Sequence, residues 1–148
     1  ERPGFISLVE SGKSASAQGF DAGGLSPAPA VGPATSQMVI GEVKGGFQQG
    51  QQYFAKDTFT AVTTTLSKNL RQSRVVAQQK GVVSQFDAAV SSGNIVVVIK
   101  LVGNAVVAGT VWPKLERAIK DKIRAYIKAN YPDVDLKEVM KSVRIEWR

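Results

Sequence analysis

The block from Asn94 to Tyr131 constrains the fold more than any other stretch, because it joins two β-prone apolar runs to an amphipathic helix pattern. The apolar runs, residues 95–102 and 105–111, meet at Gly103-Asn104. Glycine takes positive φ angles without steric cost, so this dipeptide suits a two-residue turn. The sequence therefore predicts a β-hairpin at this point.

Both faces of the predicted hairpin are largely apolar. If Val102 faces Ala105 across the turn, Ile99 lies opposite Ala108 on the core face. The second face carries Val96 and Val98, and only Lys100 gives it a charge. We therefore expect a helix or another subunit to cover this second face, and Lys100 to protect a strand edge or to form an intersubunit salt bridge.

Residues 113–130 form the strongest helix pattern in the chain. Pro113 suits the first turn, where its missing N–H costs nothing, and Asn130 before Tyr131-Pro132 ends the helix. The residues that recur at helical spacing on one side are Trp112, Leu115, Ile119, Ile123, Tyr126 and Ile127. This spacing predicts an amphipathic helix whose apolar stripe packs on the hairpin.

A basic stripe lies opposite the apolar one on the same predicted helix. It contains Lys114, Arg117, Arg124 and Lys128, with Asp121 as its one acid. One interpretation is an ordinary solvated face, since charged runs commonly have no other role. The other is a contact with phosphates or another acidic surface, because basic residues spaced along a helix can follow a charged backbone.

Composition excludes several classes of function. The 148 residues fit one domain, with 43% hydrophobic residues for a core, and the net charge of +7 favours acidic partners. There is no cysteine and no histidine, which excludes disulfides, thiolate zinc sites and every Ser-His-Asp or Cys-His arrangement. The longest aliphatic run, Ile95–Ile99, is too short to span a bilayer. We expect no enzyme activity, no cofactor and no metal.

Residues 1–36 are rich in Gly, Ser, Ala and Pro, a composition that predicts a flexible or partner-ordered arm. An alternative is a loop lying on its own domain. One apolar patch within the arm could mediate self-association; it contains Phe5, Ile6, Leu8 and Val9. The chain begins at Glu1, and a processed N-terminus together with the lack of cysteine is compatible with a virion or an extracytoplasmic location.

The remaining segments predict short elements on either side of the central block. Asp135 followed by Glu138 is a helix-start signal for one turn, and a weak hard-cation site there with Asp133 is the less favoured interpretation. The predicted strands cover residues 37–46, 74–78, 82–90 and 143–147, and a further helix covers about residues 51–70. Residues 74–111 would then form four consecutive strands of an antiparallel meander.

These elements predict an α+β fold: a two-layer domain over residues 37–148, with an antiparallel sheet of four to six strands and two main helices, preceded by the arm. Two functions fit it. The first is a non-catalytic assembly subunit of a virion, filament or envelope complex, which forms homo-oligomers through the arm and the apolar strand residues Val96 and Val98. The second is a basic nucleic-acid-binding module that uses the exposed face of the 113–130 helix.

Overall fold

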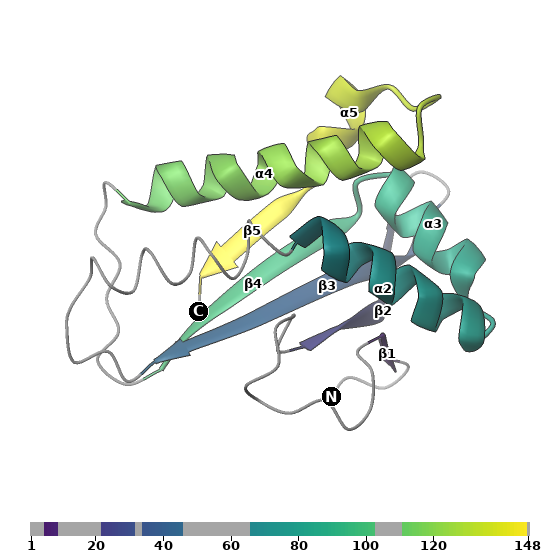
Figure 1. The fold of residues 1–148 in the computed structure, drawn as a ribbon, viewed down its shortest axis with the longest axis horizontal. Helices are drawn as coiled ribbons and strands as arrows, with labels where there is room; N and C mark the ends of the chain where they lie inside the picture. The colour runs from purple at the N-terminus through teal and green to yellow at the C-terminus, as the bar shows by residue number, and fades with distance from the viewer. Residues whose placement is uncertain (1–4, 9–21, 32–33, 46–65, 103–110, 148) are drawn as a thin grey trace.

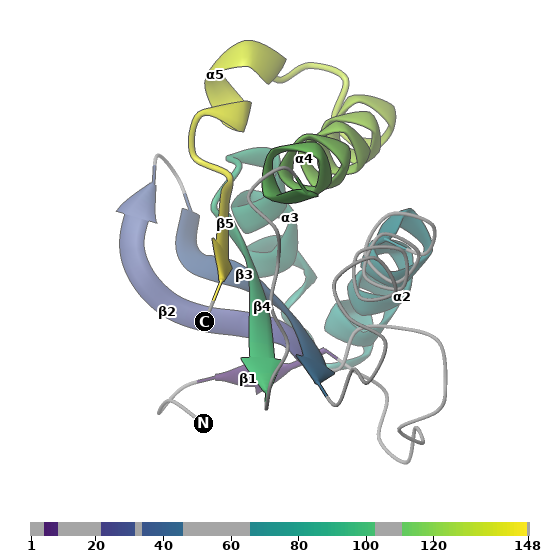
Figure 2. The ribbon, with the colours of Figure 1, turned by 90° about the vertical axis from the view of Figure 1, so that its left-hand side faces the viewer.

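The computed structural model of the chain describes residues 5–8, 22–31, 34–45, 66–102 and 111–147. In these residues a five-stranded sheet carries helices on one face (Figure 1), and Figure 2 shows the same two layers from the side. The elements are β1 (Ile6–Ser7), β2 (Ala22–Val31), β3 (Ala34–Gly45), α2 (Leu66–Gln79), α3 (Val83–Ser91), β4 (Ile95–Val102), α4 (Val111–Asn130), α5 (Leu136–Met140) and β5 (Arg144–Trp147). The predicted two-layer α+β class is confirmed.

The sheet is mixed rather than antiparallel. Its strand order is β1-β2-β3-β4-β5; β2 is antiparallel to β1 and β3, whereas β4 is parallel to both β3 and β5. The chain between β3 and β4 contains α2 and α3, and the chain between β4 and β5 contains α4 and α5. Parallel neighbours need such crossover connections, so the positions of the helices in the sequence account for the strand directions.

The core lies between the sheet and the helices. On β4, Ile95, Val97 and Ile99 are fully buried, because alternate residues of a strand point to the same face. From the helices, Phe86 of α3 and a stripe of α4 fill the space above them; the α4 residues are Leu115, Ile119, Ile123, Tyr126 and Ile127. No helix in the described part of the chain combines the length and the apolarity needed to cross a membrane.

Two segments predicted as strands are helices. Residues 74–78 lie in α2, whose buried residues follow a helical spacing that overrides the β-propensity of Val75-Val76. Residues 82–90 mostly form α3, where Phe86, Ala89 and Val90 are buried at the i, i+3 and i+4 positions of a helix. The predicted antiparallel meander is therefore wrong. Lys80 and Gly81 form the turn between the two helices, in which Gly81 has a φ of 74°.

Of the predicted central hairpin, the structure describes only the first strand, β4. Gly103-Asn104 and residues 105–110 lie outside the described residues. Ile99 is flanked by Glu42 of β3 and Trp147 of β5, so both edges of β4 are occupied there and the predicted pairing with Ala108 is wrong. The predicted helix over 113–130 is confirmed by α4, and the predicted strands at 37–46 and 143–147 are confirmed by β3 and β5.

Of two further predictions, the helix turn at Asp135 is confirmed and the helix over residues 51–70 is met in part. The turn that begins near Asp135 is α5, and the Asp135 side chain accepts a hydrogen bond from the Glu138 backbone N–H, as a helix cap does. The helix predicted over residues 51–70 is described only from Leu66, where α2 begins. Residues 51–65 lie outside the described part.

Part of the predicted N-terminal arm belongs to the sheet. Ala22–Val31 is β2, which pairs along β3, and Leu25 is only 1% exposed. A side chain at Gly24 would collide with the backbone of Ile6, so glycine here lets β1 lie against β2. The prediction of an arm therefore does not describe residues 22–31, while residues 1–4 and 9–21 lie outside the described residues.

Candidate functional site

The predicted basic stripe lies on the outer side of α4. Lys114, Arg117, Arg124 and Lys128 are all exposed. They face away from the sheet because the apolar stripe of the same helix, which includes Leu115 and Ile119, is fully buried against it. The structure therefore brings the four predicted residues together on one accessible surface.

Most of this positive charge has no acidic ion-pair partner among the described residues. Arg124 forms an ion pair with Asp121 at 2.7 Å between Nη1 and Oδ1, in which both side chains are about half exposed. Within the described residues, Lys114, Arg117 and Lys128 form no ion pair. In the described part of the chain, an approaching anion would meet three cations that have no ion-pair partner and one that is loosely paired.

The residues predicted for self-association are placed differently. Leu8 is 2% exposed and belongs to the core of its own chain, and Val96 is 5% exposed. Phe5, Ile6 and Val98 are half-buried, and Val9 lies outside the described residues. Leu8 and Val96 thus contribute to packing within the chain, which leaves Val98 as the more accessible of the two predicted strand positions.

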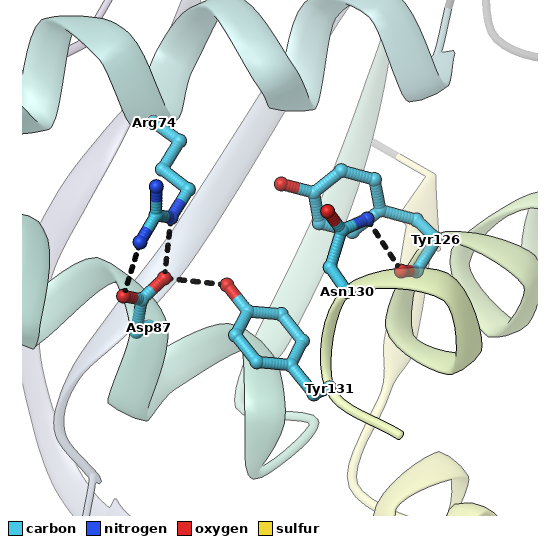
Figure 3. Close-up of polar contacts among 5 residues, drawn as sticks. All are labelled: Arg74, Asp87, Tyr126, Asn130 and Tyr131. Atoms are coloured by element: carbon cyan, nitrogen blue, oxygen red, sulfur yellow. Dashed lines mark hydrogen bonds and ion pairs between the residues drawn. The ribbon is translucent and has the colours of Figure 1, made fainter.

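The structure also shows a polar cluster that no pattern in the sequence predicted. Arg74 of α2 donates two hydrogen bonds to Asp87 of α3, from Nε to Oδ1 at 2.8 Å and from Nη2 to Oδ2 at 2.9 Å. The hydroxyl group of Tyr131, just after α4, donates a hydrogen bond of 2.6 Å to Asp87 Oδ1 (Figure 3). One carboxylate therefore links all three large helices. These residues are far apart in the sequence and share no motif.

The pKa directions in this cluster argue against acid–base chemistry. Burial alone would raise the pKa of Asp87, but the hydrogen bonds from Arg74 and Tyr131 and the positive charge of Arg74 outweigh burial, so its pKa lies below the usual value. Burial and the neighbouring Asp87 raise the pKa of Tyr131. A carboxylate with a lowered pKa is a weak base and a tyrosine with a raised pKa is a weak acid, so the cluster serves as a cross-link.

A second tyrosine, which is buried, packs against Tyr131 of the cluster. Tyr126 is 3% exposed, and its ring meets that of Tyr131 edge to face with centroids 6.4 Å apart. Its backbone carbonyl oxygen accepts a hydrogen bond from Asn130 Nδ2 at 2.9 Å (Figure 3). Burial raises the pKa of Tyr126, and its hydroxyl group has no hydrogen-bond partner among the described residues. This neutral buried ring packs between α4 and its neighbours.

We expect the substitution Asp87→Asn to destabilise the fold by about 1–2 kcal/mol at pH 7, because it weakens partly exposed hydrogen bonds to a charged group. The pKa of Asp87 is lowered by folding, so its contribution is present above the unfolded pKa of about 3.9 and is lost as the pH falls through the folded-state pKa. Urea unfolding at pH 7 and at about pH 2 should show the gap between wild type and variant shrink.

The matched control is Asp133→Asn, at an exposed position after α4. It removes the same charge, and we expect it to change the free energy of unfolding by less than about 0.5 kcal/mol at either pH. An Asp87→Asn variant that lost equal stability at both pH values would contradict the assignment of this linkage to Asp87.

The rest of the described surface holds no cluster of three or more Asp or Glu side chains that could bind a metal ion. Comparison with known proteins found no match: no family model, no curated protein and no solved structure is similar enough to indicate a relative. The proposals below therefore depend on the residues of this chain alone.

Proposed function

We propose that this domain is a non-catalytic binding module whose α4 surface docks on nucleic acid. The observation that carries the proposal is the exposure of Lys114, Arg117, Arg124 and Lys128 on one side of a helix that is anchored by its opposite side. A rigid row of cations of this kind attracts a phosphate backbone and needs no catalytic group.

The dimensions of the stripe suit a backbone contact. From Lys114 to Lys128 the helix rises roughly 21 Å, at about 1.5 Å per residue. Phosphates of one DNA strand are about 3.4 Å apart along the duplex axis, so several lie within reach of the four side chains. The net charge of +7 adds long-range attraction to the same partner.

The test is a salt titration of binding to a labelled duplex of about 20 base pairs. Wild type should bind with a log affinity that falls linearly with log salt. Neutralising the four stripe residues to Gln should make that slope less negative by up to about 3.6, at roughly 0.9 per lost phosphate contact. Gln has a helix propensity close to those of Lys and Arg, so α4 should be retained, and circular dichroism checks this.

A matched control removes four other exposed charges that lie off the α4 stripe. Its substitutions to Gln are at Lys80, Lys137, Lys141 and Arg144. If binding depends only on net charge, the two variants will weaken equally, and the proposal of a defined α4 surface is wrong. Binding by wild type that is absent or independent of salt would also refute it.

A second candidate function is self-assembly through the face of the sheet that lies away from the helices. The large helices lie on one side of the sheet (Figure 2). On the other side Val39 and Val98 are half-buried rather than buried. We propose homo-oligomerisation there as the alternative, in a building-block role. Light scattering would test it: a wild-type oligomer should dissociate in Val98→Lys, and a wild-type monomer at high concentration would refute it.

A further inference from the structure

Helix α2 presents a second basic surface beside that of α4. The two helices are in contact and lie on the same face of the sheet (Figures 1 and 2). Leu66 and Leu70 anchor α2 in the core, while Lys68 and Arg71 are exposed. Because both helices bury the side that faces the sheet, their exposed cations project outward from the same layer.

The charge balance of this layer is strongly positive. Helices α2, α3 and α4 together contain nine basic and three acidic residues, and α2 has no acid at all. Each of the three acids already accepts a hydrogen bond from a basic side chain: Asp87 from Arg74, Glu116 from Lys120 and Asp121 from Arg124. Among the described residues, Lys68 and Arg71 form no ion pair.

The scarcity of exposed apolar side chains on this surface argues against a protein partner. Within the described residues, Val75 is the one large hydrophobic residue that is exposed, at 50%. Protein interfaces are centred on buried apolar and aromatic anchors, and a single valine does not supply them. The recognition that the described side chains of this layer leave available is electrostatic.

The aromatic side chains that the structure describes in this layer argue against a single strand. Phe86 and Tyr126 are buried, and Tyr131 is half-buried with its hydroxyl group bonded to Asp87. Single-stranded nucleic acid is bound largely by stacking of bases on exposed rings, and these three rings are not free to stack. A duplex hides its bases and presents two rows of phosphates, so cations alone can bind it.

We infer that α2 and α4 together bind double-stranded nucleic acid, with each helix contacting one of the two phosphate backbones across a groove. Packed helices lie about 8–10 Å apart, and DNA grooves are about 6 and 12 Å wide, so long Lys and Arg side chains on both helices can reach both backbones. This inference rests on the proposed function and adds α2, through Lys68 and Arg71, and the duplex form of the ligand.

The experiment compares wild type with the double variant Lys68→Gln/Arg71→Gln. The probes are a DNA duplex of about 20 base pairs and an oligo-dT of about 20 nucleotides, each titrated over a range of salt. We expect wild type to prefer the duplex. The double variant should bind the duplex about tenfold more weakly at 0.1 M salt, with a slope less negative by about 1.8, and should lose the preference.

The control is Lys137→Gln/Lys141→Gln, which removes the same charge from exposed positions in and after α5. It should change duplex affinity by less than about threefold. If the α2 variant behaves like this control while the α4 variant loses affinity, the role of α2 is refuted and the proposed function stands. A wild-type preference for oligo-dT refutes the duplex form alone, and no binding of either probe refutes both proposals.

Discussion

Replacing Gly93 with alanine is expected to lower the free energy of unfolding by about 4 kcal/mol, since two separate penalties of about 1–3 kcal/mol each apply. Gly93 joins α3 to β4 with a φ of 72°, a backbone conformation that residues other than glycine rarely adopt. A Cβ at this position would also collide with the backbone carbonyl oxygen of Val139 in α5. Backbone atoms cannot turn aside as a flexible side chain can, so α5 or β4 must shift.

Gly81 supplies the matched control for this prediction. Its φ of 74° is almost the same, but no atom of the described residues lies within 4 Å of the position that a Cβ would take. Gly81→Ala should therefore cost only about 1 kcal/mol, the conformational penalty alone. Urea unfolding followed by circular dichroism measures both variants. Equal losses would mean that the contact between Gly93 and Val139 does not constrain the fold.

The second large effect is expected at Phe86. This side chain of α3 is fully buried in the core, and truncation to alanine should destabilise the fold by about 3–5 kcal/mol through lost burial and the cavity left behind. The reduction should appear as a lower urea midpoint with an unchanged m-value, because the surface exposed on unfolding hardly changes.

Val75→Ala is the control for Phe86→Ala. Val75 is also apolar and lies on the neighbouring helix α2, but it is 50% exposed, so its truncation should change stability by less than about 0.5 kcal/mol. This pair of variants separates the effect of burial from that of truncation itself. Phe86 is buried together with Ala89 and Val90, as the helical spacing of α3 requires, whereas a strand over residues 82–90 would have placed Ala88 on the face of Phe86.

Local patterns in the sequence determined the elements whose signals are long or chemically specific. The helix over 113–130 was predictable because several turns of apolar spacing outweigh any single residue preference. The cap at Asp135 was predictable because a carboxylate three residues before a backbone N–H satisfies it locally. The same periodicity placed Lys114 and Lys128 on the exposed side, so the basic surface of α4 could be found from the sequence.

Tertiary structure decided what local patterns leave open. Residues 74–78 and 82–90 carry short β-prone runs, and their burial against the sheet selected the helix instead. Ala22–Val31 has a composition typical of a flexible segment, yet pairing with β3 supplies backbone hydrogen bonds that composition does not reveal. Strand direction, the bonds of Asp87 to Arg74 and Tyr131, and the placement of α2 beside α4 all depend on contacts between residues distant in sequence. Such contacts leave no periodic signal, because they form only when the separate elements pack together.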